Sequence, residues 1–433
     1  MYALKCAVQT YGWGRPSSES LVASLKEAED SDFQVNSDHC YAELWMGTHP
    51  NGPSQLRLED GEHPLKEWVI KHPETLGCLE ELRDIPFMFK VLAINKALSI
   101  QSHPSNELAE LLHETYPDIY KDPNHKPEIA IALSDFEAMC GFRPIETILE
   151  NIRKFPELNA LLSEQALDLL EQCERFPQAQ KLVHKIALRE LFTSYLHAED
   201  EKAKEQLDLL IERLKSEIEG QEDSNLDLLD EDTRLKLLIV RLSNQYPQDR
   251  GMMAPIFFNY LRLKKGESIF LPANEPHAYL SGEILECMAC SDNVVRAGLT
   301  PKFIDRDTLC SMLTYRARVP SVRPGKVKEN DRMRERYYTP VEEFEVAVVS
   351  VPANEKYTLG SIDSPTFFLV LEGMGSGSSA FGEASLSFGS TYFIPANTEV
   401  VVSNISSDHC FKFTIAHANL RLKQKRTSVA LAN

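Results

Sequence analysis

The chain has 433 residues, of which 43% are hydrophobic and 26% charged, as in ordinary globular proteins. This length exceeds what one hydrophobic core usually serves, so two or three domains are expected. The formal net charge of −19 argues against a general nucleic-acid binder and against a protein held on anionic lipid, because both need a dominant basic surface.

Cysteine usage and hydropathy indicate the compartment. The nine cysteines are an odd number scattered along the chain, which is typical of free thiols in a reducing environment. No apolar run reaches the roughly 18 residues that span a bilayer, and the N-terminal MYALKCAVQTYGWG lacks the charged start and apolar core of a signal peptide. We therefore expect a cytoplasmic protein that binds neither nucleic acid nor a membrane.

The first three segments of the chain alternate in character. Residues 1–144 mix β-like runs such as KCAVQTY and PFMFKVLAI with helical pieces such as NELAELLHETYP, which predicts a sheet-based domain. Residues 145–247 place apolar residues at three- and four-residue spacing with charges between them, which predicts a helical module. Residues 248–319 return to β-like runs separated by turn signals.

The rest of the chain is predicted to be a linker followed by a second β unit. Residues 320–338 are basic and contain prolines, so we expect a crossing linker. Short strands with Gly, Ser and Pro between them then predict a sandwich or barrel of the jelly-roll kind. The stretches SIFLPAN and TYFIPAN share the pattern aromatic-x-x-Pro-Ala-Asn, which favours two related β-barrel units.

The first candidate site lies in SIQSHPS, residues 99–105. In a strand, residues i and i+2 point to one face, so Gln101 and His103 are predicted to project side by side. A metal site and a hydrogen-bonded core pair would each explain this arrangement.

A second candidate lies in YKDPNHKPEIAIAL, residues 120–133. A proline-punctuated turn delivers Lys126 and Glu128 to the start of an apolar strand. The carboxylate of Glu128 is predicted to face the same side as Ala130 and Ala132, whose small side chains leave room around it.

A third candidate lies in EPHAYLSGEILECMAC. Ser281 and Gly282 have the composition of a two-residue hairpin turn, and that register would set His277 opposite Glu286. Opposed side chains lie about 5 Å apart at Cβ, so a histidine and a carboxylate are predicted to share one face of a β-ribbon. The lone CxxC of Cys287 and Cys290 is predicted to be neither a zinc knuckle nor a redox pair, since odd spacing on a strand separates the two thiols.

Together these segments offer two imidazoles, one carboxylate and one amide oxygen, from Gln101, His103, Glu128 and His277. This set suits zinc, which takes nitrogen and oxygen ligands and keeps an open position in catalytic sites. Because one carboxylate cancels only one of the two positive charges, the site would attract an anionic sugar. Taken singly, each residue could be an ordinary half-buried or turn-capping side chain.

Four segments resemble the type I phosphomannose isomerase family. YKDPNHKPE and HAYLSGEILECMACSDNVVRAGLTPKFID look like its two signature segments, and AELWMGTHPNGPS and PFMFKVLAINKALSIQSHPSNELAELLH resemble further blocks. The resemblance implies a mainly β fold of the cupin superfamily, with two cupin or jelly-roll β-barrel units plus a helical domain. It implies a catalytic domain of residues 1–144 and 248–319, a helical domain of 145–247 and a C-terminal barrel of 320–433.

The resemblance also implies an activity. Members are zinc-dependent aldose–ketose isomerases that interconvert D-mannose 6-phosphate and D-fructose 6-phosphate through an enediol(ate), supplying mannose for GDP-mannose synthesis or for mannose use. The Gln and His of QSH, the Glu of NHKPE and the His of HAYL hold one zinc ion in the family. These residues are Gln101, His103, Glu128 and His277 here. Arg296 of NVVRAG matches the family's catalytic arginine.

The reaction removes a proton next to a carbonyl, so it needs a base and groups that stabilise the enediolate. Glu286 and Lys126 are both candidates for the base, because a zinc-bound His277 would be a poor one.

The substrate phosphate needs a local basic patch in this acidic chain. We expect Ser99, Lys90 and Lys302 to bind it with help from Arg296. The expected partner is a small sugar phosphate, and we expect a monomer.

Two alternatives come from other functional classes. A sugar-phosphate sensor on the same fold would not need the charged stabiliser Arg296. A metal-dependent oxygenase would favour three histidines or a two-His-one-carboxylate iron centre, which the amide ligand Gln101 does not fit.

Overall fold

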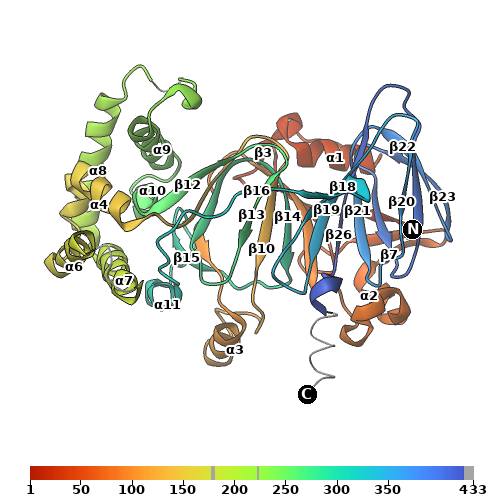
Figure 1. The fold of residues 1–433 in the computed structure, drawn as a ribbon, viewed down its shortest axis with the longest axis horizontal. Coiled ribbons are helices and arrows are strands. Elements are labelled where there is room, and N and C mark those ends of the chain that lie inside the picture. The colour runs from red at the N-terminus through yellow and green to blue at the C-terminus, as the bar shows by residue number, and fades with distance from the viewer. Residues whose placement is uncertain (177–180, 222–223, 424–433) are drawn as a thin grey trace.

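The computed structural model describes residues 1–176, 181–221 and 224–423. Three parts follow one another along the longest axis of the molecule, with helices at one end, a large sheet in the middle and two further sheets at the other end (Figure 1). Within the described ranges, no helix has the length and apolar character needed to cross a membrane.

The central sheet has eleven strands, and its longest strand is β14. Its main path runs in the order β16 (Arg323–Pro324), β13 (Glu267–Leu271), β10 (Glu128–Ala132), β14 (His277–Ala289), β8 (Phe87–Ile94), β5 (Glu43–Met46) and β2 (Ala7–Gln9). Four strands join it off this path: β11 (Phe136–Phe142), β12 (Phe258–Leu263), β9 (Ile100–Ser102) and β15 (Val295–Gly298). A separate short pair is formed by β3 (Arg15–Pro16) and β4 (Cys40–Tyr41).

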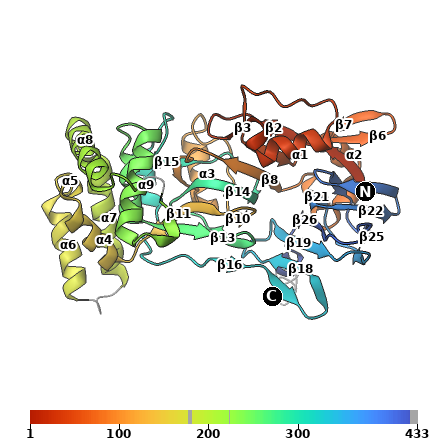
Figure 2. The same cartoon turned by 90° about the horizontal axis from the view of Figure 1, so that it is seen from above.

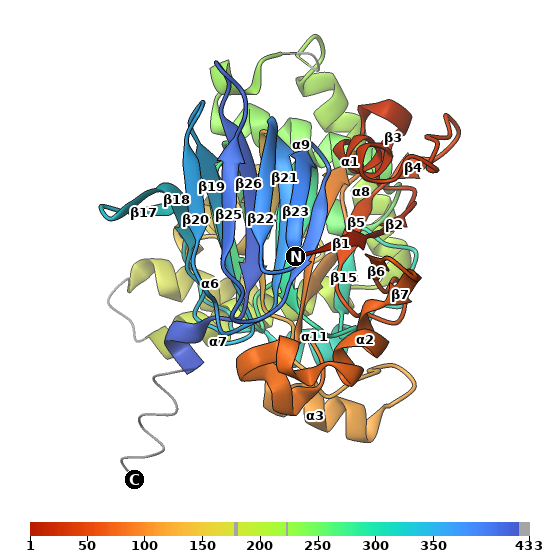
Figure 3. The ribbon, with the colours of Figure 1, turned by 90° about the vertical axis from the view of Figure 1, so that its right-hand side faces the viewer.

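Two sheets form the C-terminal end of the molecule, stacked face to face (Figure 3). The larger sheet runs β17 (Lys326–Lys328), β18 (Asp331–Tyr337), β19 (Glu345–Val351), β26 (Phe411–His417), β21 (Thr366–Glu372), β24 (Thr391–Ile394), β1 (Tyr2–Lys5), β6 (Gln55–Leu58) and β7 (Gly61–Pro64). The smaller sheet runs β20 (Lys356–Leu359), β25 (Val400–Asn404), β22 (Met374–Ser379) and β23 (Gly382–Ser387). Buried apolar residues from both sheets, including Val349, Phe413 and Val402, fill the space between them.

The larger C-terminal sheet contains the beginning of the chain. β1 pairs with β24 on one side and with β6 on the other. The predicted linker of residues 320–338 is wrong in part, because β16, β17 and β18 all lie within it and extend two different sheets.

The helical end of the molecule is continuous in sequence. It consists of α4 (Ile145–Lys154), α5 (Pro156–Asn159), α6 (Glu164–Arg175), α7 (Lys181–His197), α8 (Asp200–Glu217), α9 (Glu231–Gln245) and α10 (Ala254–Phe257). The side chains of Ser163 and Asp230 cap α6 and α9 by accepting from backbone N–H groups of the first turn, which explains where these helices begin. Further α-helices of the described residues lie elsewhere: α1 (Leu21–Glu29), α2 (Leu65–Lys71), α3 (Asn106–Thr115) and α11 (Arg306–Met312).

Strand alternation gives the central sheet two different faces. Phe87, Phe89 and Val91 of β8 point into a core shared with the larger C-terminal sheet, where Phe367 and Phe344 lie. The view from above shows the central sheet and the larger C-terminal sheet next to each other along the longest axis of the molecule (Figure 2). Met88 and Lys90, which alternate with these three residues on β8, therefore point to the opposite face of the central sheet. That face is free to line a cavity.

The Pro-Ala-Asn repeat marks the ends of strands. Asn274 and Asn397, which end the two stretches noted in the sequence, adopt φ values of +64° and +60°. Asn354, in a third Pro-Ala-Asn after β19, adopts +60° as well. Asparagine tolerates this left-handed conformation better than most residues, so the motif turns the chain after a strand.

The predicted fold class, mainly β with a helical module, is confirmed. The β units are open, stacked sheets of the cupin-like sandwich kind rather than closed barrels, since the strand order of neither large sheet closes on itself in the described residues. The domain boundaries remain a prediction, and the pairing of β1 with β24 shows that the N-terminal and C-terminal segments share one sheet.

Candidate active site

The free face of the central sheet forms the floor of a cavity of about 480 Å³. Lys90 of β8, Glu286 of β14 and Trp45 of β5 are successive partners across three strands, and all three line the cavity. Ala130 of β10 is the partner of Glu286 on the other side, so Glu128, two residues away, projects from the same face. This confirms the predicted facing of Glu128.

Most of the residues predicted from the sequence meet in this cavity. Its lining includes Lys90, Ser99, Gln101, Lys126, Glu128, Glu286, Arg296 and Lys302. The other two predicted residues, His103 and His277, are buried and lie against Glu128. The roles assigned to these ten residues remain predictions.

His103, Glu128 and His277 form a group that could hold a metal ion. One ligand atom from each lies within 4.8 Å of the others, and all three side chains are buried. His103 Nε2 is 3.4 Å from Glu128 Oε1, and His277 Nε2 is 3.4 Å from Glu128 Oε2. Both Nε2 atoms and Oε2 of Glu128 lack a hydrogen-bond partner in the described structure. Buried polar atoms are normally paired, so three converging atoms without partners suggest a cation between them.

The far side of each imidazole fixes its orientation. His103 Nδ1 lies 2.7 Å from the backbone carbonyl oxygen of Asn293, and His277 Nδ1 lies 3.1 Å from that of Glu275. A carbonyl oxygen can only accept, so Nδ1 carries the proton in the neutral ring and Nε2 presents a lone pair. Histidines that bind metals usually have such a partner behind them.

Charge and burial fit the same interpretation. Burial opposes the charged form of Glu128, but His103, His277 and Lys126 outweigh it and hold the pKa of this carboxyl well below its usual range. Burial lowers the pKa of His103 to about 4, which keeps its Nε2 unprotonated at neutral pH. Two imidazoles and one carboxylate are a donor set suited to zinc.

Gln101 lies between two other candidates in the sheet. It is the direct partner of His277 on β14 and of Arg296 on β15. Directly opposed side chains project from the same face, so these three side chains form a row across the strands. The amide of Gln101 is thereby placed beside a metal-binding histidine and a guanidinium.

The predicted hairpin at Ser281 and Gly282 is wrong. Residues 277–289 form one long strand, β14, whose partner changes at this point. Ser281 pairs with β11, whereas Gly282 pairs with Ile94 of β8. Gly282 has φ +112°, and a Cβ there would lie 2.5 Å from the carbonyl oxygen of Asp135, so the glycine serves a close strand contact and not a turn. His277 and Glu286 are therefore not cross-strand neighbours.

Glu286 and Lys90 belong to a buried charge network that includes Glu43. Lys90 Nζ is 3.1 Å from Glu43 Oε2 and 3.6 Å from Glu286 Oε2. Burial by itself lowers the pKa of Lys90, yet the two carboxylates raise it above its usual value. Burial, followed by the charge of Glu128, raises the pKa of Glu286 to about 7. Lys90 thus already has two anionic partners, and its predicted contact with the substrate phosphate remains a prediction.

Several lining residues were not anticipated as functional. Glu43 accepts a 2.6 Å hydrogen bond from Trp45 Nε1, which fixes both side chains in the wall. Nε2 of His49 lies 3.2 Å from Asp292 Oδ1, and both residues line the cavity. Glu43 and Trp45 are two residues apart in AELWMG, so strand alternation predicts that their side chains share one face. This was the signal in the sequence that could have indicated them. Trp13 and Trp45 both line the cavity wall.

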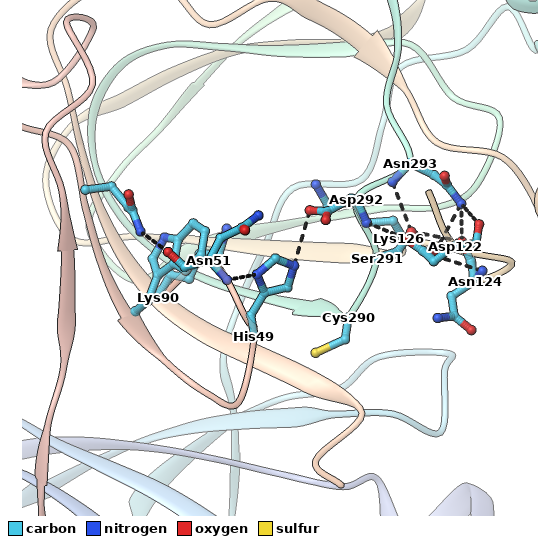
Figure 4. Close-up of polar contacts among 12 residues, drawn as sticks. His49, Asn51, Lys90, Asp122, Asn124, Lys126, Cys290, Ser291, Asp292 and Asn293 are labelled. Carbon is cyan, nitrogen blue, oxygen red and sulfur yellow. Dashed lines mark hydrogen bonds and ion pairs between the residues drawn. The ribbon is translucent and has the colours of Figure 1, made fainter. Parts of the chain in front are cut away.

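Two loops are joined beside the site (Figure 4). Asn293 Nδ2 donates to the carbonyl oxygens of Asp122 at 2.6 Å and Asn124 at 3.0 Å. The backbone N–H of Asp292 donates to Asp122 Oδ2 at 2.7 Å, and Ser291 Oγ donates to the carbonyl oxygen of Asn124 at 3.0 Å. The loop that leads to Lys126 and Glu128 is therefore attached to the loop that follows β14.

The two thiols of the CxxC lie in different surroundings, in agreement with the predicted effect of their odd spacing. Cys287 points into the core shared with the C-terminal sheet, whereas Cys290 packs near Trp45 and Met288. Both thiols are free.

Comparisons with known proteins find relatives over most of the chain. Residues 1–145 match a model of the phosphomannose isomerase type I catalytic domain, and residues 161–258 match its helical insertion domain. Mannose-6-phosphate isomerase 1 of Arabidopsis thaliana is 41% identical over 92% of this chain and 90% of its own length. The Bos taurus mannose-6-phosphate isomerase is 41% identical over 92% of this chain and 94% of its own.

The chain belongs to the type I phosphomannose isomerase family. It is accordingly an isomerase.

Solved structures of the family share the whole fold. A mutant phosphomannose isomerase from Salmonella typhimurium is 26% identical and superposes with a TM-score of 0.79, covering 96% of this chain and 99% of its own. A mannose 6-phosphate isomerase solved with bound zinc and yttrium has a TM-score of 0.77, 26% identity and the same coverage. Family membership therefore rests on both sequence and structure.

Proposed function

We propose that this chain interconverts D-mannose 6-phosphate and D-fructose 6-phosphate through an enediol(ate), with one zinc ion held by Gln101, His103, Glu128 and His277. The observation that carries the proposal is the convergence of three buried, unpartnered ligand atoms of this set beside a cavity that Arg296 also lines. The family relatives act on mannose 6-phosphate by name, and one was solved with zinc.

A bound zinc ion would supply Lewis-acid polarisation of the substrate carbonyl or orient its two oxygens. Arg296 supplies a further positive charge at the cavity wall. Burial lowers the pKa of Arg296, but a guanidinium stays protonated at any physiological pH. It is therefore suited to stabilise the negative charge that develops on the enediolate oxygens.

Glu286 is the base we propose for moving the proton between C1 and C2. It lies in the cavity floor, and Lys90 and the strand partners on both sides hold it in place. Lys126 also lines the cavity, but its Nζ lies 3.7 Å from Glu128 Oε1, so its ammonium group already has a carboxylate partner. We therefore give Lys126 the role of holding substrate oxygens beside the metal ligands.

We assign the substrate phosphate to Ser99 and Lys302, which line the same cavity as Arg296. A hydroxyl and an ammonium group together match the acceptor oxygens of a phosphate monoester.

The experiment is a measurement of zinc per chain and of fructose 6-phosphate formed from mannose 6-phosphate, before chelation, after chelation and after zinc is restored. Activity should disappear with zinc and return with it. A chelated, metal-free protein with full activity would exclude the zinc-dependent reaction, and a zinc-loaded protein without turnover would favour a sugar-phosphate sensor.

A further inference from the structure

A second cavity, of about 430 Å³, lies where the central sheet meets the chain that enters the larger C-terminal sheet. Ile129 and Phe270 line it and are partners on β10 and β13. Their side chains project from the face opposite to Glu128, so this cavity is distinct from the candidate active site. Tyr338 and Pro340 form the wall on the C-terminal side.

The charge of this second cavity is opposite to that of the whole chain. Its lining contains four cations and a single carboxylate, Glu275; the cations are Arg316, Arg318, Arg323 and Lys326. All four are exposed, and among the described residues none has a carboxylate partner within ion-pair distance. Burial raises the pKa of Glu275, the one carboxylate of the lining, and the charges of Arg316 and Arg318 partly offset this rise. In a chain with a net charge of −19, four cations around a hollow with a single carboxylate suggest an anionic ligand.

The floor of this cavity contacts the backbone around both candidate metal-binding histidines. Glu275 Oε1 accepts from Thr314 Oγ1 at 2.6 Å, and the carbonyl oxygen of Glu275 is the partner of His277 Nδ1. The N–H of Asn274 donates to the carbonyl oxygen of His103 at 2.8 Å. Thr314 is two residues from Arg316, and its N–H donates to the carbonyl oxygen of Asn274 at 3.0 Å. A ligand that draws Arg316 inward would therefore pull on the turn that orients the His277 imidazole and holds the backbone carbonyl of His103.

We propose that this second cavity binds a small molecule carrying one or two phosphate groups, and that its occupancy changes turnover through the Asn274–Glu275 turn. Guanidinium groups recognise phosphate through paired hydrogen bonds, and the volume lies in the range of small-molecule sites. Phosphate binding in this cavity does not depend on the proposed function, whereas the effect on turnover rests on the proposed function of His103 and His277.

Binding is tested by calorimetry with inorganic phosphate, at constant ionic strength, on the zinc-loaded protein. We expect two sites in the unsubstituted chain, one in each cavity. The double variant Arg316→Gln/Arg318→Gln should weaken one of them by about tenfold or more, because two guanidinium contacts are lost. Lys302→Gln should weaken the other site only.

The matched control is Arg153→Gln/Arg175→Gln, which removes the same charge from the helical end of the molecule. It should bind phosphate like the unsubstituted chain. Unchanged binding in Arg316→Gln/Arg318→Gln, or an equal loss in the control, would overturn the site. Because these outcomes do not involve the active-site cavity, they are distinguishable from a failure of the proposed function.

The effect on turnover is tested by steady-state kinetics with added phosphate. In the unsubstituted chain, phosphate should raise KM through the active-site cavity and also lower kcat, by about fivefold at saturation. In Arg316→Gln/Arg318→Gln only the rise in KM should remain. A loss of kcat that persists in this variant would overturn the coupling between the two cavities.

Discussion

The backbone carbonyl oxygen of Asn293 accepts a hydrogen bond from His103 Nδ1 at 2.7 Å, while the side-chain amide of Asn293 holds the carbonyl oxygens of Asp122 and Asn124. One residue thus orients a candidate metal ligand and also attaches the loop that carries Lys126 and Glu128. The two functions use different atoms, so they can be separated by substitution.

Asn293→Asp keeps the backbone carbonyl but replaces the donor amide with oxygens that face two carbonyl oxygens. We expect zinc to be retained and kcat to fall by about tenfold or more, because the loop with Lys126 is released from its position. The free energy of unfolding should fall by about 1–3 kcal/mol. Zinc content, kcat, KM and thermal unfolding are the measurements.

The control for Asn293→Asp is Asn419→Asp. Asn419 is also buried, and its Nδ2 donates to the carbonyl oxygens of Thr339 and Val341 in the C-terminal part of the chain. It should lose a similar amount of stability with kcat unchanged. If both variants lose kcat equally, Asn293 acts only through overall stability.

His277→Ala removes one of the three converging ligand atoms. We expect zinc per chain, measured by atomic absorption after dialysis, to fall at least about tenfold, since loss of even a supporting contact costs that much in metal affinity. The control is His417→Ala, which truncates another buried histidine, whose Nε2 contacts Arg334 Nη2 at 2.9 Å. Full zinc retention by His277→Ala would contradict the ligand assignment.

Arg296→Ala should collapse turnover while leaving bound zinc in place. Removal of a charge aimed at a developing oxyanion typically costs about 10²- to 10³-fold in kcat. Arg296→Lys restores the charge without the planar fork and should recover part of the rate. Concurrent loss of zinc from Arg296→Ala would show that the arginine maintains the structure of the site.

The ionisation of Glu286 should produce the acid limb of the pH profile of kcat/KM. Burial and the charge of Glu128 raise its pKa to about 7 in the metal-free chain, and a bound divalent cation would lower that value. As the base it must be ionised, so kcat/KM should decrease as pH falls through its pKa, and the midpoint should lie below 7 in the zinc-loaded enzyme.

Glu286→Gln should lose about 10²-fold or more in kcat and should lack this limb. If Glu286→Gln keeps the same acid limb, Lys126 and not Glu286 is the base. Lys126→Gln is then the variant that should lose the limb.

Local periodicity predicted a large part of the fold and the site. The two-residue alternation of strands places Glu128 on the cavity face and Cys287 on the core face, and the three- and four-residue spacing between 145 and 247 predicted the helical end correctly. These inferences depend only on residues close in sequence.

The errors have a common physical origin in partners that are distant in sequence. Ser281–Gly282 has turn composition, but Gly282 is required by the close approach of Asp135, which no local pattern reveals. The orientation of His103 and His277 depends on the backbone carbonyl oxygens of Asn293 and Glu275, which every residue possesses, so no side-chain motif could indicate it. The ion pair between Lys90 and Glu43 joins residues 47 positions apart.

The position of β1 has a consequence for synthesis of the chain on the ribosome. Thr391 Oγ1 donates to the carbonyl oxygen of Leu4 across 387 residues, so one edge of β1 lacks its partner until β24 has been made. At translation rates of 5–20 residues per second this wait is about 20–80 s. During that time the nascent chain exposes the unpaired edge of β1. Chaperones that shield unpaired strand edges would therefore have the longest time to bind at this strand.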